Sequence, residues 1–359
     1  MIVMELRYIS ENNTIEFSPK KFLPMTYRDL ICTIQSDSPL KYEGFADSFN
    51  TITDYDNLTS GNKFSFDINF KHPLSIFALV EGGWLPLPFA NPSIFLVDRN
   101  VISVLSKFSQ ETHRTDFEDT KWWVNFIQHS SFVINPILYA FEGDKQRLPS
   151  LNEFIDSFEE ASLKIAKQFP HSKLIRYTEQ TYRDVYKIVS GFADRTDREI
   201  NFLMKTVNKI INRVADSNLP EIRSEIIHDA DKYKLLKKSL LVFAVLSCLY
   251  EKKDGSGFLA TRKIIKPKKK YTEKDAYNAI ADIRLIECFI ATFALIQLKD
   301  IKPFALCTCD KSLAAFWCAL EIQYIKLHKD KLKINFTMSE ELFPRLNDVE
   351  REELNQILS

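Results

Sequence analysis

The sequence contains no apolar run long enough to span a membrane. The two longest runs, Ser239–Tyr250 and Cys288–Leu298, fall short of the roughly 20 residues that a bilayer requires. Both are therefore predicted to be buried helices. The first residues, MIVMELRYISENN, also lack the basic segment, apolar stretch and small-residue cleavage site of a secretory signal. We expect a cytoplasmic protein that does not associate with membranes.

Glycine, histidine and cysteine are too sparse or too scattered to form several common sites. No glycine-rich loop is present to bind a nucleotide phosphate, and the six histidines show no spacing typical of a metal site or a catalytic triad. The six cysteines lie mostly inside apolar runs, which favours buried thiols over a disulfide framework. Cys307 and Cys309 are two residues apart in a predicted strand and are poorly placed to bind zinc.

The chain also lacks an excess of charge of either sign. Lysine plus arginine and aspartate plus glutamate number 48 each, so the net charge neither favours nor excludes nucleic acid, which needs only a local basic surface. One local concentration lies in the predicted basic loop Gly255–Lys270, where Lys266–Lys270 reads KPKKK. Such runs are usually solvated, and phosphate contact is the weaker alternative. The candidates for that contact are Lys268, Lys269, Lys270 and Arg284.

What is present is typical of a globular protein with two units. Hydrophobic residues make up 45% of the chain and charged residues 27%. Residues 1–90 are predicted to form a small β-rich accessory unit, and the glycine- and proline-rich segment Gly82–Pro92 is predicted to connect it to the rest. The predicted strand-forming stretches are Leu6–Ser10, Thr14–Ser18, Asp29–Gln35 and Lys63–Phe70.

Residues 91–359 alternate strands with a long helical passage. Apolar residues recur three and four apart through most of this region, and the predicted strands flank it. That order is typical of an α/β fold with a central parallel sheet, here with an enlarged helical part. The predicted strands are Ile94–Val97, Phe304–Cys309 and Leu332–Phe336. The predicted helices are Leu151–Phe169, Glu179–Ser190, Arg195–Ala215, Pro220–Tyr250 and Glu273–Leu298.

Two aspartates follow the first two of these strands. Asp98 ends the run IFLVD and Asp310 follows FALCTC, and an apolar helix is predicted directly after each. In open α/β sheets, ligands bind at the carboxyl edge of the strands, so the two carboxylates are expected to share one crevice. Thr308 lies on the same face of its strand as Asp310. The structural alternative for both aspartates is a helix N-cap.

A third aspartate, Asp282, lies near the start of an otherwise apolar helix. An isolated carboxylate there is costly to bury, and a divalent cation would remove that cost. The alternative is that Asp282 complements the positive end of the helix dipole.

Four segments together resemble the acidic motifs of PIN-like nucleases. They are, in chain order, SIFLVDRNVISVLSKF, INPILYAFEGD, YNAIADIRLIECFIATFAL and FALCTCDKSLAAF. In that family a strand ends in aspartate with a polar residue two positions on, a glutamate follows on a helix, an aspartate opens another helix, and a last strand reads threonine, any residue, aspartate. The matching residues are Asp98 with Asn100, then Glu142, Asp282, and Thr308 with Asp310.

The resemblance covers about Ser93 to Phe336 and has two departures. The interval from Glu142 to Asp282 is far longer than in compact members, and Glu287 can be read as the third ligand in place of Asp282.

The resemblance implies a three-layer α/β fold and a Mg²⁺ or Mn²⁺ ion held by the four carboxylates. The implied activity is hydrolysis of phosphodiester bonds in RNA and sometimes in DNA. A toxin or a stress or defence effector is one setting consistent with that activity. The N-terminal unit would then recruit substrate, a protein partner or an inhibitor. The alternative is a catalytically inactive PIN-like scaffold within a larger complex.

Overall fold

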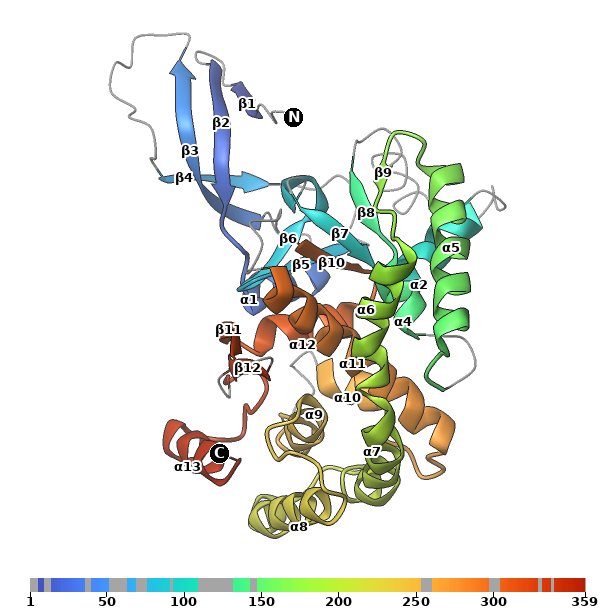
Figure 1. Ribbon diagram of the computed structural model, residues 1–359. Coiled ribbons are helices and arrows are strands. Elements are labelled where there is room, and N and C mark those ends of the chain that lie inside the picture. The colour runs from blue at the N-terminus through green and yellow to red at the C-terminus, as the bar shows by residue number, and fades with distance from the viewer. Residues whose placement is uncertain are drawn as a thin grey trace.

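The computed structural model places a mixed sheet at the centre of the chain and helices around it (Figure 1). It describes residues 6–9, 14–35, 40–51, 63–68, 76–90, 93–108, 132–142, 147–252, 260–296, 304–328, 331–336 and 339–358. None of the helices in these ranges is long and apolar enough to cross a membrane.

The central sheet has six strands in the order β6-β5-β10-β7-β8-β9. β7, β8, β9 and β10 pair in parallel, whereas β5 pairs antiparallel with both β10 and β6. The fold is thus α/β with a mixed, largely parallel sheet, and the expectation of a purely parallel sheet is corrected at its β5–β6 edge. The bounds are β5 Phe77–Val80, β6 Gly83–Pro86, β7 Ile94–Val97, β8 Val133–Asn135, β9 Lys173–Leu174 and β10 Phe304–Thr308.

The two strands β7 and β10 lie side by side in the interior. Every residue of both is buried, which explains their uninterrupted apolar runs, since a strand covered on both faces has no solvent side.

The turn between β5 and β6 was expected to belong to a connection between units. Instead Gly82–Pro92 contributes β6 and the 3₁₀ helix η1 (Leu87–Ala90), so the sheet begins before the boundary predicted at residue 90. Gly82 has φ +83°, which favours glycine. At Gly83 a Cβ atom would lie 2.1 Å from the carbonyl oxygen of Met25, so no side chain fits there.

The N-terminal residues form a separate four-stranded antiparallel sheet, in the region where a β-rich unit was predicted. Its strands are β1 Leu6–Ile9, β2 Thr14–Phe22, β3 Leu40–Thr51 and β4 Lys63–Ile68. The strand predicted at Asp29–Gln35 is wrong, because these residues form helix α1 (Tyr27–Gln35). Thr26 and Asp29 exchange hydrogen bonds at the start of α1, and this capping favours the helix over a strand.

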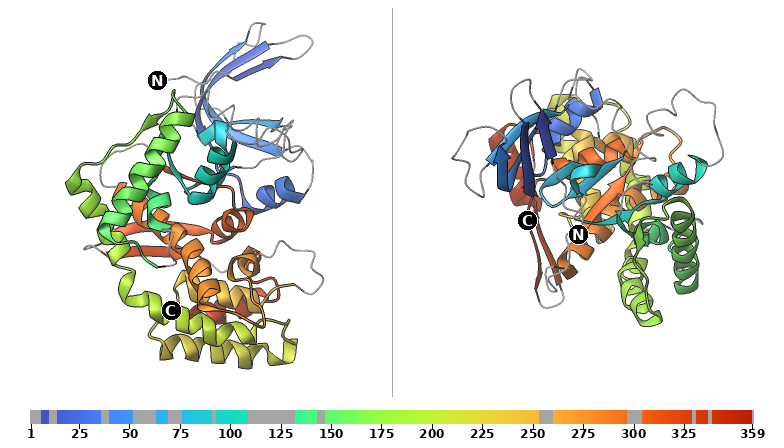
Figure 2. Two further views of the ribbon diagram at one scale, coloured as in Figure 1. Left: turned by 90° about the vertical axis from the view of Figure 1, so that its right-hand side faces the viewer. Right: turned by 90° about the horizontal axis from the view of Figure 1, so that it is seen from above.

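Helices cover the sheet and build a second, mostly helical half (Figure 2). The predicted single helix Pro220–Tyr250 is divided, because Lys234 adopts a left-handed conformation with φ 53° and Ser239 then caps a new helix. The helix predicted at Arg195–Ala215 ends in 3₁₀ turns. The bounds are α2 Arg99–Phe108, α4 Ile137–Glu142, α5 Leu151–Gln168, α6 Glu179–Ser190, α7 Ala193–Thr206, η2 Val207–Lys209, η3 Asp216–Asn218, α8 Leu219–Lys232, α9 Leu240–Leu249, α10 Ala260–Ile265, α11 Glu273–Ile296, α12 Lys311–Ala319 and α13 Asp348–Leu358.

The last predicted strand forms, but outside the central sheet. Leu332–Phe336 lies within β12 (Lys331–Phe336), which pairs antiparallel with β11 (Ile322–His328) in a two-stranded sheet.

Candidate active site

The register of β7 and β10 brings the first and last acidic motifs together. Val97 pairs with Cys307, and the backbone N–H of Asp98 donates to the carbonyl of Cys307 at 3.3 Å. Asp98 is therefore level with Thr308, and Asp310 follows two residues later at the same edge. The prediction that these two aspartates share the carboxyl edge of the sheet is confirmed.

Both aspartates also cap the helix that follows. Oδ1 of Asp98 accepts the N–H of Val101 at 2.8 Å, and Oδ1 of Asp310 accepts the N–H groups of Ser312 and Leu313 at 2.7 and 3.0 Å. The N-cap alternative thus accounts for one oxygen of each carboxylate. It does not account for Oδ2 of Asp98, which is buried without a hydrogen-bond partner. Such an atom is costly to bury unless it has a partner.

Glu142 and Asp282 approach the same edge from two helices. Glu142 is the last residue of α4, and its Oε1 accepts the backbone N–H of Arg99 at 3.3 Å. Asp282 was expected near the start of an apolar helix, but α11 begins at Glu273, as predicted, where Thr272 and Asp275 cap it, so Asp282 lies well inside the helix. The helix-dipole alternative for Asp282 is therefore excluded by its position.

The carboxyl groups of Asp98, Glu142, Asp282 and Asp310 lie within electrostatic range of one another, and together they are called the acidic cluster below. The pKa of Asp98 is raised to about 6, that of Glu142 to about 8 and that of Asp282 to about 7, and burial is the largest cause of each shift. Repulsion adds to each shift: Asp310 raises the pKa of Asp98, and Asp98 and Asp282 raise that of Glu142. Asp310 and Asp98 likewise raise that of Asp282. Several raised carboxyl pKa values at one sheet edge are typical of a functional site.

The donor atoms of this cluster fit a hard divalent cation. Carboxylate oxygens are the ligands that Mg²⁺ prefers, and the unpartnered Oδ2 of Asp98 is available to one. Among the described residues, no three acidic, histidine or cysteine side chains converge as they stand to enclose an ion. Mg²⁺ does not need such a cage, because it is usually held by one or two carboxylates and keeps several waters.

Comparisons of the chain with protein-family models, curated proteins and solved structures found no match. Any functional interpretation therefore depends on the sequence motifs and on the geometry of the cluster.

The two polar residues expected to support the cluster differ in placement. Thr308 is fully buried, its hydroxyl accepts the N–H of Asp310 at 3.0 Å, and it lowers the pKa of Asp98. The side chain of Asn100 is exposed on the first turn of α2, and only its backbone N–H acts on Asp98.

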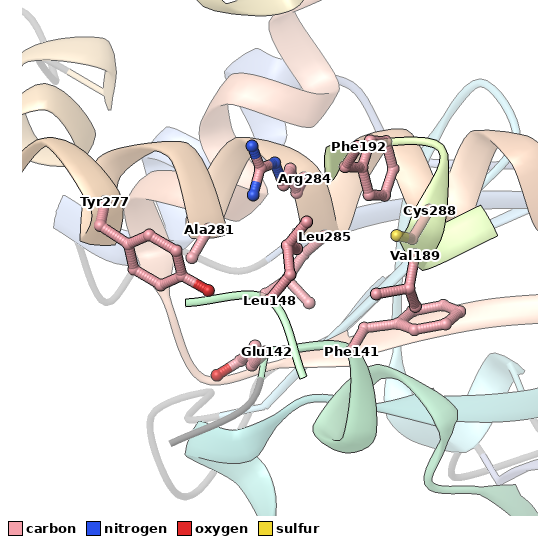
Figure 3. A pocket seen from close by; sticks show the side chains of 10 residues that line it. All are labelled: Phe141, Glu142, Leu148, Val189, Phe192, Tyr277, Ala281, Arg284, Leu285 and Cys288. Atoms are coloured by element: carbon pink, nitrogen blue, oxygen red, sulfur yellow. The ribbon is translucent and has the colours of Figure 1, made fainter. Parts of the chain in front are cut away.

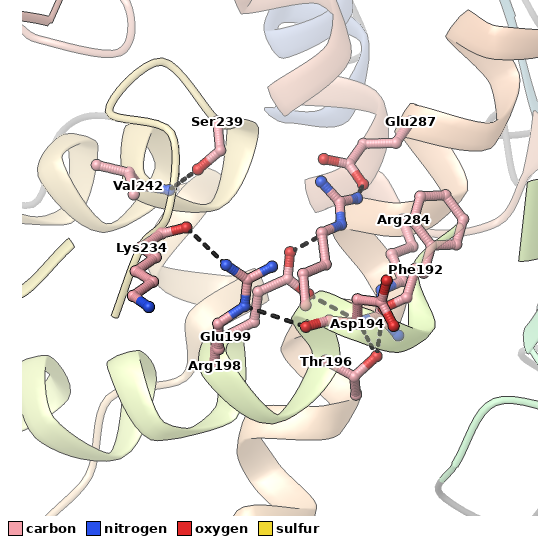
Figure 4. Close-up of polar contacts among 11 residues, drawn as sticks. Phe192, Asp194, Thr196, Arg198, Glu199, Lys234, Ser239, Val242, Arg284 and Glu287 are labelled. Carbon is pink, nitrogen blue, oxygen red and sulfur yellow. Dashed lines mark hydrogen bonds and ion pairs between the residues drawn. The ribbon is translucent and has the colours of Figure 1, made fainter. Parts of the chain in front are cut away.

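Glu287 and Arg284 belong to a separate ion-pair network between α7 and α11 (Figure 4). Glu287 pairs with Arg195, so the alternative third ligand is already neutralised elsewhere. Arg284 is only 6% exposed, and its Nη2 lies 2.7 Å from Glu199 and 2.8 Å from the hydroxyl of Thr196. The expected phosphate contact through Arg284 is therefore replaced by an internal ion pair.

Replacement of Arg284 by methionine is expected to destabilise the protein by about 3 kcal/mol, because it leaves the buried charge of Glu199 without this partner. Chemical denaturation of the two proteins measures the difference. The double variant Arg284→Met with Glu199→Gln is the control and should recover part of the loss. A loss below about 1 kcal/mol in the single variant would contradict a buried pair.

A small cavity lies beside Glu142 (Figure 3). Its volume is about 10 Å³, which is space for roughly one water. The hydroxyl of Tyr277 points toward the side where Glu142 lies, and the guanidinium of Arg284 is on the opposite side. A larger cavity, of about 500 Å³, lies near the β5–β6 turn and the end of α12, away from the carboxyl edge; charges of both signs line it, from Arg28, Glu321 and Glu341.

The basic loop between α10 and α11 lies at the edge of the cluster. Lys268 forms an ion pair with Asp275 at 2.8 Å, and Lys269 and Lys270 are exposed. The charge of Lys266 lowers the pKa of Asp282, so this lysine is within electrostatic range of the acidic cluster. In the sequence, Lys266 differs from the lysines that follow it only by its position directly before Pro267, at the end of a helix.

Proposed function

We propose that this protein is a metal-dependent nuclease of the PIN-like type that hydrolyses phosphodiester bonds in RNA. The observation that supports this most strongly is that carboxyl groups from four separate segments of the chain lie within electrostatic range of one another at the carboxyl edge of the sheet. The buried, unpartnered Oδ2 of Asp98 supports a cation at this edge. RNA is favoured over DNA by the resemblance alone.

Some residues of the acidic cluster would bind the metal ion, and others would bind or release protons. Asp98 and Asp310 are fixed by their helix-capping hydrogen bonds, so they are the best oriented to hold Mg²⁺ or Mn²⁺. Glu142 and Asp282 would complete the site directly or through water. The ion, when bound, polarises a phosphoryl oxygen and lowers the pKa of a water. Glu142, with a pKa of about 8, holds a proton at neutral pH and would release it when a cation binds.

The test is cleavage of labelled single-stranded RNA with Mn²⁺, beside the same sequence as DNA. The wild type is expected to cleave RNA, and a chelator and Asp310→Asn are each expected to abolish cleavage. Asparagine caps helices as well as aspartate does, so the variant should fold. Asp29→Asn is the matched control, because Asp29 caps α1 away from the cluster.

Cleavage that survives in Asp310→Asn would exclude this site. Cleavage of DNA alone would keep the site and change the substrate.

A second candidate function is an inactive PIN-like scaffold in a larger complex. It is favoured by the fact that, within the described ranges, no three potential ligands converge. Mn²⁺ binding separates the two: an active site should bind the ion and lose it in Asp98→Asn, whereas a scaffold should bind none. In either case we propose that the N-terminal sheet recruits a partner or substrate.

A further inference from the structure

Helix α10 is followed directly by a lysine whose backbone conformation is unfavourable. Lys266 has φ 52°, and its N–H donates to the carbonyl of Arg262 at 2.8 Å, which closes the helix. Glycine is the usual residue in this left-handed position, because a Cβ atom is strained there.

The position of α10 places this lysine beside the acidic cluster. α10 packs against both α11, which carries Asp282, and α12, which begins directly after Asp310 (Figure 1). Lys266 is exposed, and among the ion pairs recorded for the described residues none involves it. Its effect on the pKa of Asp282 agrees with this placement. Lys268, by contrast, is occupied by Asp275.

A phosphodiester that approaches this edge meets four acidic side chains that repel it. A bound cation offsets part of that repulsion, and a positive group from the protein is needed at the side that the cation does not reach. An ammonium group held near developing phosphoryl charge also stabilises the transition state more than the ground state.

We propose that Lys266 is a catalytic residue whose ammonium group contacts a non-bridging oxygen of the scissile phosphate. This inference rests on the proposed nuclease function. In this proposal, helix α10 positions the ammonium group of Lys266 next to the acidic cluster. The lysines that follow Lys266 have no such role.

The conformation of Lys266 allows a substitution that removes the ammonium group without destabilising the fold, so a loss of activity cannot be caused by unfolding. Lys266→Gly removes the ammonium and relieves the strained conformation, so its melting temperature should equal or exceed that of the wild type. Its kcat for RNA cleavage with Mn²⁺ is expected to fall by about 100-fold, within the range seen when one such donor is removed. Lys266→Arg keeps a positive charge and should retain most of the activity.

Lys234→Gly is the matched control. Lys234 has the same left-handed conformation, with φ 53°, but it follows α8, at the end of the molecule opposite the N-terminal sheet. This variant should gain similar stability and keep the wild-type kcat.

The outcomes separate the two levels of the proposal. Wild-type kcat in Lys266→Gly would overturn the role of Lys266 and leave the nuclease function standing. Equal losses of kcat in the two glycine variants would also overturn it, since the effect would then come from the backbone. No cleavage by the wild type, with Mn²⁺ and on both RNA and DNA, would refute the nuclease function itself and with it this inference.

Discussion

Replacement of Asp98 by asparagine is expected to lower the rate of RNA cleavage by about 1,000-fold while leaving the metal-free protein at least as stable as the wild type. The asparagine carbonyl oxygen can still accept the N–H of Val101, so helix α2 keeps its cap. The substitution removes a charge that burial and Asp310 both disfavour. It also removes the buried oxygen best placed to meet a cation.

Two measurements on the same protein samples test this prediction. Initial rates of RNA cleavage with Mn²⁺ give the loss of activity, and thermal unfolding in a chelator at about pH 8 gives the change in stability, where ionised carboxylates repel most. Asp29→Asn again serves as the control for both. A variant that loses activity and also unfolds more easily would indicate that Asp98 is a structural residue.

The metal-free protein is expected to lose stability as pH rises, which is the reverse of the usual behaviour of carboxylates. Asp98, Glu142 and Asp282 have raised pKa values in the folded state, so the folded protein binds more protons than the unfolded chain between about pH 4 and pH 8. Stability therefore falls as pH rises through this window. Because the repulsion is shared among the partners, the shifts do not add, and we expect a total loss of roughly 5 kcal/mol.

Urea denaturation in a chelator at about pH 5, 6, 7 and 8 measures this dependence. Mn²⁺ should restore stability most at the highest pH, because a cation binds the ionised carboxylates. Asp282→Asn should flatten the curve. Stability that is constant or rises across the window would show that these carboxyl groups are not buried together.

The strands that carry the site were predictable because their signal is local. A strand buried on both faces appears as an unbroken apolar run, and both IFLV and FALCT do so directly before an aspartate. The parallel order of β7 and β10 then places Asp98 and Asp310 at one edge, as expected. Glu142 could be assigned only through the family resemblance. Asp282 was also singled out by its place in an apolar helix, but only the resemblance linked it to the edge of the sheet.

Other features depend on contacts that no local pattern records. The hairpin β5–β6 joins the sheet because β10 offers a free edge to it, although the sequence of Gly82–Pro92 looks like a linker. In the sequence, Arg284 resembles a cation available to the site. In the structure its side chain instead forms an ion pair with Glu199 on α7. For α1, the capping pair Thr26 and Asp29 outweighed the β-branched residues that suggested a strand.

The pairing of β7 with β10 also dictates when the protein acquires its site. The two strands are neighbours in the sheet, yet roughly 200 residues separate them along the chain. At a synthesis rate of about 5–20 residues per second, Asp310 leaves the ribosome on the order of 10–40 s after Asp98. A nascent or truncated chain that stops before β10 therefore lacks one of the two strands that pair with β7, together with Asp310, and the acidic cluster cannot assemble on it. The cell would be exposed to the activity proposed for this edge only after almost the whole chain has been made.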